Sequence, residues 1–305
     1  MIEIITAPSS LGLRPLTPGH EPGAWLAPQA LLDAGLADHV GAGRLTALEH
    51  PAYDFEAQPH TRLRNGRGLR AYSMIIAEAV GTALAAGRFP LVIGGDCANL
   101  FGSLAGARRD GRCGLLHLDG HNDFYHPNNY DTAARLGSAA GMDLALATGR
   151  GEPLLTHWPS IGTPLVADAD VVQLGDRETD VPGEQDHWAT VEDSAIVCFT
   201  AQQMAHHGIE ATAARTVDRL DERGLERVWL HLDLDILDET AMPAVDSPGS
   251  PGLGFAQLAE LLARLVADER VIGANVGIYD PEADPERRYS GPIAGALGRG
   301  FAARR

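Results

Sequence analysis

Residues 115–123 read LLHLDGHND, and this stretch decides the fold class of the chain. An apolar run of strand length ends at Asp119, and His121 and Asp123 follow at steps of two. Such a run is typical of a parallel strand that is buried on both faces, and ligands collect beyond the carboxyl ends of these strands. Residues at steps of two point the same way in extended backbone, so we expect the three side chains to converge.

A second stretch repeats this pattern later in the chain. Residues 228–235 read VWLHLDLD, so that Asp233 and Asp235 close another very apolar strand. One Asp-x-Asp taken alone is more typical of a solvated turn than of a metal site. Two such stretches bring together carboxylates that repel one another unless a cation neutralises them, and divalent cations accept oxygen ligands. Together the stretches predict a site for a pair of divalent metal ions.

The rest of the chain predicts a parallel sheet covered on both faces, because short β-forming runs alternate with longer segments rich in alanine and leucine. The eight predicted strands are residues 2–7, 45–50, 91–94, 115–119, 171–175, 195–199, 228–233 and 271–278. Helical spacing of apolar residues predicts helices over 69–84 and 255–265. No internal repeat or break in composition divides the chain, so residues 1–305 are expected to form a single α/β domain.

Composition excludes several classes of function. The 24 basic and 41 acidic residues give a net charge of -17, which disfavours nucleic acid and anionic membrane surfaces as partners. The chain contains no lysine, which excludes Schiff-base chemistry, pyridoxal-phosphate attachment and a P-loop. Three cysteines are too few for a disulfide framework, and neither a signal peptide nor a membrane span is predicted. A cytoplasmic protein is expected.

Three motifs of the chain resemble the signatures of the ureohydrolase family, which comprises arginases, agmatinases and related amidinohydrolases. They are Gly94-Gly95-Asp96-Cys97, Asp119-Gly120-His121-Asn122-Asp123, and His231-Leu232-Asp233-Leu234-Asp235 with the Pro- and Gly-rich loop 243–254. Their order and spacing agree with the family along nearly the whole chain. The resemblance implies a three-layer α/β/α sandwich on an eight-stranded parallel sheet, in agreement with the strands predicted above.

The same resemblance implies two Mn²⁺ ions and assigns their ligands. The first ion would be held by Cys97, Asp119, Asp123 and Asp233, and the second by Asp119, His121, Asp233 and Asp235. Asp119 and Asp233 would therefore bridge the two ions. Such a pair lowers the pKa of a shared water enough to give hydroxide near neutral pH, which would attack a planar amidino carbon. Asp123 is expected to serve catalysis as well as metal binding.

Cys97 departs from the family pattern, because most members have histidine at this position. A thiolate is softer than an imidazole, so Zn²⁺ or Fe²⁺ becomes possible beside Mn²⁺. The branch of the family that hydrolyses Nω-hydroxyarginine also carries cysteine here, and the chain is most similar in pattern to that branch. The alternative is a buried structural cysteine, with the first metal held by carboxylates alone.

Further departures affect the substrate. The family's proton-shuttling histidine falls at Leu136, which cannot shuttle protons, and His126 is the predicted substitute. The glutamate that anchors a guanidinium aligns with Asn275, which offers a hydrogen bond without a charge. Residues that hold an amino-acid head group would fall near Tyr125 and Thr132 and do not match. Asn275 and Tyr125 are the predicted substrate contacts, and plain arginine is not the expected substrate.

These observations predict a dinuclear-metal hydrolase of linear C–N bonds. It would be an amidinohydrolase that acts on a modified guanidino or hydroxyguanidino compound, in specialised metabolism. Two alternatives stay open: a formimino or amide hydrolase on the same metal site, and a non-catalytic relative that the metals only stabilise. The expected partners are the small guanidino-type substrate and further copies of the chain, since trimers and hexamers are common in the family.

Overall fold

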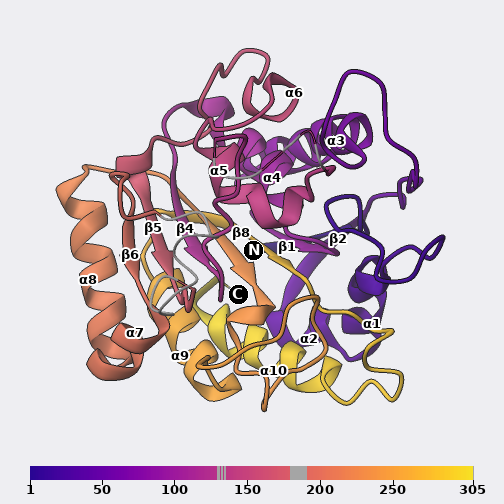
Figure 1. Ribbon diagram of the computed structural model, residues 1–305. Coiled ribbons are helices and arrows are strands. Elements are labelled where there is room, and N and C mark those ends of the chain that lie inside the picture. The colour runs from indigo at the N-terminus through magenta and orange to yellow at the C-terminus, as the bar shows by residue number, and fades with distance from the viewer. Residues whose placement is uncertain (129–130, 132, 134, 179–190, 305) are drawn as a thin grey trace.

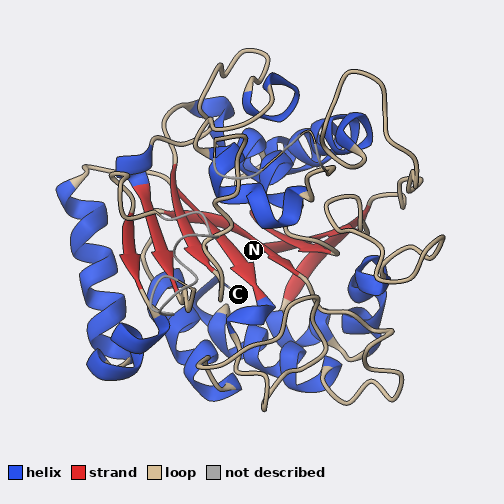
Figure 2. Cartoon of the chain, viewed as in Figure 1, coloured by secondary structure: helices blue, strands red, loops and turns tan. Residues whose placement is uncertain are grey.

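The computed structural model describes residues 1–128, 131, 133, 135–178 and 191–304, and its centre is an eight-stranded sheet. The strand order is β2-β1-β3-β8-β7-β4-β5-β6, and every neighbouring pair is parallel (Figure 2). The strands are β1 (Ile2–Ala7), β2 (Ala42–Ala47), β3 (Phe89–Gly94), β4 (Gly114–Leu118), β5 (Val171–Leu174), β6 (Val197–Phe199), β7 (Val228–Asp233) and β8 (Val271–Gly277). The predicted α/β class is confirmed.

All eight predicted strands are present, and the largest differences lie at the two edges of the sheet. β2 begins at Ala42 and not at residue 45, because it pairs only with β1, where Ile2 lies opposite Ala42. β6 begins two residues later than predicted, at Val197. Edge strands bury fewer side chains, so their sequences carry a weaker apolar pattern than those of central strands. The central strands β1, β3, β4 and β7 are buried along their whole length.

Helices cover both faces of the sheet, which gives the predicted three layers (Figure 1). On one face α3 packs against β1 and β3, α4 packs against β7 and β8, and α5 and α6 contact this pair of helices. On the other face α10 contacts α1, α2 and α9. The helices are α1 (Ala27–Asp33), α2 (Leu36–Val40), α3 (Gly66–Ala85), α4 (Asn99–Ala107), α5 (Asp143–Ala147), α6 (Pro153–Thr156), α7 (Ala201–His207), α8 (Ile209–Glu222), α9 (Phe255–Val266) and α10 (Ser290–Gly300).

The two helices predicted from periodicity are α3 and α9. The side chains of Leu69, Tyr72, Ile76 and Val80 in α3 are buried, as the helical spacing requires. In α9 the buried face is formed by Leu258, Ala259, Leu261, Leu262, Leu265 and Val266. Among the described residues, every helix is too short or too polar to cross a lipid bilayer.

The order of the strands places four strand ends side by side in the middle of the sheet. β3, β8, β7 and β4 are consecutive neighbours, although β3 and β4 are consecutive in the chain. The connection from β3 to β4 therefore passes over two strands. After β4 the chain continues outward to β5, whereas after β7 it returns to β8, so the connections that leave the neighbouring strands β4 and β7 run in opposite directions across the sheet. In open parallel sheets, ligands bind beyond the carboxyl ends of strands at such a switch. The residues after these four strands are the place to look for a site.

Candidate metal centre

The two acidic stretches meet because their strands are neighbours in register. His117 of β4 lies opposite His231 of β7, and Leu118 lies opposite Leu232. The next residues along each strand, Asp119 and Asp233, therefore lie side by side at the edge of the sheet. Both carboxylates are buried, with 0% and 2% of their surface exposed. The pairing of the strands thus forces together two charges that are more than a hundred residues apart in the sequence.

Beyond β4 the side chains converge through a tight turn. The backbone N–H of His121 donates to Asp119 Oδ1 at 2.7 Å, which folds the chain back on the carboxylate. Gln173 Nε2 donates to the carbonyl oxygens of Asp119 and His121, at 3.2 and 2.9 Å. Asp123 has a left-handed backbone with φ +45°. The expected extended backbone is therefore wrong for this segment, since a turn and not strand alternation aims the side chains.

The segment after β7 also turns immediately. Asp233 Oδ1 accepts a hydrogen bond from the N–H of Asp235 at 2.7 Å, at the start of a short 3₁₀ helix over Leu234–Ile236. Asp235 then reaches across to the other segment, where Oδ1 accepts from Gly120 N–H at 3.0 Å and Oδ2 lies 2.8 Å from His121 Nδ1. These contacts join the two motifs into one site.

Cys97 enters the site from the loop after β3. This loop is pinned by Asp96, which accepts hydrogen bonds from Ser9 Oγ at 3.1 Å and from the N–H groups of Gly12 and Ala98. Only glycine fits at residue 95, because a Cβ there would lie 1.9 Å from the carbonyl oxygen of Ser9. The fixed loop directs Cys97 Sγ to Asp233 Oδ2, to which it donates at 2.5 Å. The first predicted ligand therefore contacts a predicted bridging ligand.

The charges of the site are poorly balanced without a cation. Burial and the neighbouring Asp235 raise the pKa of Asp119 to about 7. Burial and mutual repulsion also raise the pKa values of Asp123 and Asp233 well above their ordinary range. Burial opposes a charge on His121, but Asp235 and Asp119 hold its pKa well above the usual value. The site thus holds more buried acidic groups than His121 and the buried guanidinium of Arg177, which lies 3.8 Å from Asp235, can neutralise.

The donor atoms fit divalent metal ions. Asp119 Oδ2 is buried, lies 3.8 Å from His117 Nε2 and has no hydrogen-bond partner among the described residues, so a lone pair of this bridging candidate is available to a metal ion. Ligand atoms of Asp119, His121 and Asp235 lie within 4.8 Å of one another. Carboxylate and imidazole donors suit Mn²⁺. Burial and the nearby carboxylates raise the pKa of Cys97 well above its ordinary value, so its thiol must release a proton in order to bind a metal.

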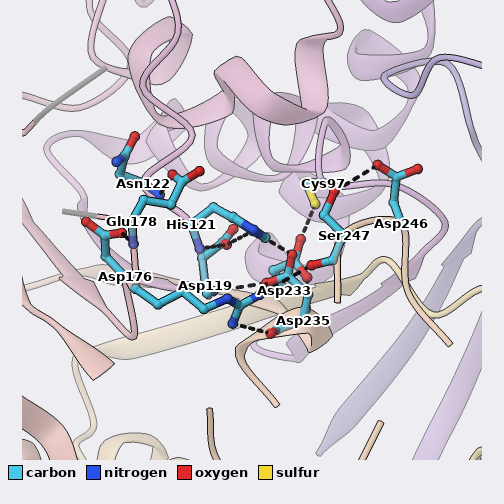
Figure 3. Close-up of polar contacts among 12 residues, drawn as sticks. Cys97, Asp119, His121, Asn122, Asp176, Glu178, Asp233, Asp235, Asp246 and Ser247 are labelled. Carbon is cyan, nitrogen blue, oxygen red and sulfur yellow. Dashed lines mark hydrogen bonds and ion pairs between the residues drawn. The ribbon is translucent and has the colours of Figure 1, made fainter. Parts of the chain in front are cut away.

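A cavity of about 230 Å³ opens onto this cluster. Figure 3 shows Cys97 beside Asp233, with Asp119, His121 and Asp235 grouped next to them. Five of the six predicted metal ligands line the cavity and Asp119 lies buried behind them, while the predicted substrate contact Tyr125 also lines it. The lining ligands are Cys97, His121, Asp123, Asp233 and Asp235.

Two predicted site residues do not face the cavity. The ring of His126 packs edge-on against Phe124, and its Nδ1 accepts from the N–H of Asn128 at 3.3 Å. Asn275 is 1% exposed and uses both ends of its amide inside the protein, toward His231 and Trp229. Its position in β8, two residues before the strand ends, keeps it below the cavity. Thr132 lies outside the described residues.

Seven residues that line the cavity are not among the predicted site residues, and three of these bear on its chemistry: Glu178, Asp246 and Ile278. Glu178 follows β5, and its Oε2 accepts a hydrogen bond from Asn122 N–H at 3.3 Å. Asp176, which follows the same strand, is fully buried. The sequence could have indicated Glu178 as a site residue, because it lies shortly after a predicted parallel strand. Ile278 follows β8 with φ +76°, so the last central strand sends an apolar side chain into the site.

A buried polar network lies beneath the ligands. Trp229 Nε1 donates to Asn275 Oδ1 at 2.7 Å, so the amide nitrogen of Asn275 faces His231 Nδ1 at 2.6 Å. The proton of a neutral His231 is then on Nε2, which lies 3.4 Å from Asp143 Oδ2. His117 Nε2 lies 3.0 Å from the other oxygen of Asp143. The fully buried Asp143 carboxyl thus lies between two histidines, with one oxygen near each ring. Burial raises the pKa of Asp143 to about 7.

Asp143→Ala is expected to lower the free energy of unfolding of the metal-free protein by about 2 to 4 kcal/mol, because it removes the hydrogen bond to the buried His117 and the carboxyl that lies 3.4 Å from the buried His231. Urea unfolding in the presence of a chelator measures this change. The control is Asp110→Ala, since Asp110 is exposed and only 3.6 Å from Arg227 in a surface ion pair, worth less than about 1 kcal/mol. Equal effects of the two substitutions would show that the network does not stabilise the fold.

The fold and the ligand cluster together define a metal-dependent hydrolase with an α/β/α architecture. The chain belongs to the arginase family, whose sequence model matches residues 2–299. It is 31% identical over 284 residues to the arginase of Bacillus caldovelox, which covers 87% of this chain and 90% of that protein. The ureohydrolase resemblance is therefore confirmed, and the family depends on two metal ions, typically manganese.

Solved arginase structures share the whole fold. The native structure of the Bacillus caldovelox arginase superposes with a TM-score of 0.83 and 27% identity, covering 98% of this chain and 97% of that one. The Bacillus cereus arginase gives a TM-score of 0.82 at 25% identity, with 98% of both chains covered. The three-layer architecture is thus that of the family.

Proposed function

We propose that the protein is a metal-dependent amidinohydrolase whose substrate is a modified guanidino compound, such as a hydroxyguanidine, and not an ordinary guanidinium. The observation that carries this choice is the wall of the cavity at the end of β8. There Ile278 lies beside the ligands, buried to 3% exposure, and Asn275 points away. This wall offers a substrate no carboxylate, whereas the family resemblance implies a glutamate after the last strand.

The proposed ligand sets are those implied by the resemblance. Cys97, Asp119, Asp123 and Asp233 would hold one Mn²⁺, and Asp119, His121, Asp233 and Asp235 the other, with Zn²⁺ or Fe²⁺ possible through the thiolate of Cys97. When bound, such a pair supplies a water with a lowered pKa and a Lewis acid for the amidino group. Hydrogen bonds fix the ligands in place, since Gln173 Nε2 donates to the carbonyl oxygen of His121 and the N–H of Gly120 donates to Asp235 Oδ1.

The leaving group must be a good one, because the chain offers little help with its departure. Leu136 replaces the shuttling histidine, and His126, the predicted substitute, does not line the cavity. An N–OH substituent lowers the pKa of the leaving nitrogen, so its expulsion depends less on a proton donor. Glu178 lines the cavity, and burial raises its pKa. We assign it the role of accepting an N–H of the substrate.

The same proposal covers location and assembly. The substrate is a small molecule, and a cytoplasmic trimer or hexamer is expected from the family resemblance. Native mass measurement of the purified protein tests the assembly directly.

Nω-hydroxyarginine is expected to be hydrolysed faster than arginine or agmatine by the Mn²⁺-loaded protein, by about tenfold or more. An ordinary guanidinium would lack the carboxylate partner that the family resemblance implies after the last strand, and the loss of such a charged partner discriminates by orders of magnitude. A side-by-side assay of urea and hydroxyurea release at matched concentrations measures this ratio.

Two outcomes would contradict the proposal. If arginine or agmatine were hydrolysed tenfold faster than the hydroxyguanidine, the apolar wall would not select the substrate. If no guanidine reacted, the formimino or amide alternative would replace it, and a panel of formimino amino acids would be tested next. An Asp233→Ala variant serves as the inactive control in both cases.

A further inference from the structure

A second cavity adjoins the first and continues it toward the surface. Its volume is about 260 Å³, and it shares part of its wall with the metal-side cavity. The shared residues are Leu13, Tyr125, Ala140, Gly141, Asp246 and Ser247. Each cavity alone is smaller than most small-molecule sites, and the two together fall within their range of about 300 to 1,000 Å³. The two cavities together extend from the metal ligands to the exposed Arg14 and Arg135.

The two ends of this passage carry opposite charge. The metal-side cavity is lined by carboxylates, whereas the outer cavity is lined by two arginines, Arg14 and Arg135. Asp246 lies at the junction and lines both cavities. Burial raises the pKa of Asp246, and the hydroxyl of Ser247 and the guanidinium of Arg14 oppose that effect, so Arg14 lies close enough to act on Asp246. From the metal ligands outward, the passage therefore presents first the carboxylate of Asp246 and then the guanidinium groups of Arg14 and Arg135.

The junction is held rigidly to the metal centre. Arg177 is 6% exposed and donates from Nη1 to the carbonyl oxygen of Asp235 at 2.9 Å and from Nη2 to that of Ser247 at 3.3 Å. Ser247 Oγ in turn lies 3.3 Å from Asp246 Oδ2. Figure 3 shows Asp246 and Ser247 on the opposite side of Cys97 and Asp233 from Glu178. Asp246 therefore keeps a fixed position relative to the ligands, on the outer side of the site.

We propose that the outer cavity binds the amino-acid end of the substrate, with Asp246 accepting its ammonium group and Arg14, assisted by Arg135, binding its carboxylate. Arginine matches a carboxylate in two parallel hydrogen bonds, which a neutral side chain does not provide. This recognition differs from the head-group contacts implied by the family, which do not match at Tyr125. The inference rests on the proposed function and adds the residues that would select the amino-acid end of Nω-hydroxyarginine, namely Arg14, Arg135 and Asp246.

The test compares variants with substrates that lack one charge. Arg14→Gln is expected to raise KM for Nω-hydroxyarginine about tenfold to a hundredfold, with kcat nearly unchanged, because a charge-assisted contact made equally in ground and transition states is lost. For the decarboxylated hydroxyguanidine the same variant should leave KM unchanged. Asp246→Asn should raise KM for both compounds but not for the deaminated analogue. Arg14→Lys keeps the charge and should lie between wild type and Arg14→Gln.

Binding of ornithine and of its decarboxylated diamine to the Mn²⁺-loaded chain provides a readout that does not need turnover. Wild type should bind ornithine more tightly, and Arg14→Gln should lose that difference, whereas the exposed Arg299→Gln control should keep it. Equal effects of Arg14→Gln on compounds with and without a carboxylate would overturn the inference. If wild type hydrolysed no guanidine but still bound ornithine through Arg14, the proposed reaction would fail and the amino-acid site would stand.

Discussion

Replacing Asp119 by alanine is expected to abolish the metal pair, so that the purified protein keeps far less than the roughly two ions per chain expected of a two-metal hydrolase. Asp119 is the residue on which the site depends most, because it contacts His121 and lies beside Asp233, and one of its oxygens has no hydrogen-bond partner among the described residues. Activity should fall by about a thousandfold or more, since loss of metal assistance costs several kcal/mol of transition-state stabilisation. Elemental analysis and the hydroxyguanidine assay measure the two effects.

Stability separates this result from simple misfolding. In the absence of metal the buried Asp119 carboxylate is repelled by Asp235, so its removal should not destabilise the metal-free protein strongly. Mn²⁺ binds only the folded state of the wild type and should raise its melting temperature, and Asp119→Ala should lose this rise. Asp218→Ala on the exposed side of α8 is the control and should keep it. Full metal content in Asp119→Ala would refute the assignment of a bridging ligand.

The central part of this site could be predicted because it is encoded locally. Each acidic stretch follows an apolar run that can only be a buried strand, and parallel strands bring their carboxyl ends to one edge. Hence Asp119 and Asp233 were predicted to meet, and their strands are indeed neighbours in register. The geometry that aims the side chains was predicted wrongly, because the hydrogen bonds from the N–H groups of His121 and Asp235 to these carboxylates depend on turns that the pattern does not encode.

The outer parts of the site could not be predicted for a different reason. Ile278 and Asp246 are ordinary residues in their own segments, and only packing between distant segments directs them into one cavity. For Asn275 the prediction failed in the opposite sense. The family resemblance placed this residue in the site, but its amide bonds to Trp229 and His231 in the interior, beneath the cavity. Whether a side chain near the end of a strand faces the cavity or the interior depends on the residue at which the strand ends. Strand ends are the least certain part of a sequence-based prediction.

Cys97 is expected to decide which metal the protein prefers. A thiolate favours Zn²⁺ over Mn²⁺, whereas an imidazole restores the usual donor set of the family. Cys97→His should therefore shift the choice toward Mn²⁺ by about tenfold or more when both ions compete at equal concentration. Competitive dialysis followed by elemental analysis measures this shift. Cys97→Ser should lower the metal content by about one ion per chain, because Cys97 belongs to one ligand set only.

The matched control is Cys113→Ser. Cys113 is as deeply buried as Cys97, but it directly precedes β4, and its thiol donates to the carbonyl oxygen of Gly114 at 3.4 Å, at the opposite end of the strand from the metal ligands. A loss of packing or of a buried thiol would affect both variants alike, whereas metal binding would be affected in Cys97→Ser alone. Unchanged metal content, metal preference and activity in Cys97→Ser would establish the buried structural cysteine instead. In that case the hydrogen bond from Cys97 to Asp233 would only orient the bridging carboxylate, and Asp119, Asp123 and Asp233 would hold the first ion by themselves.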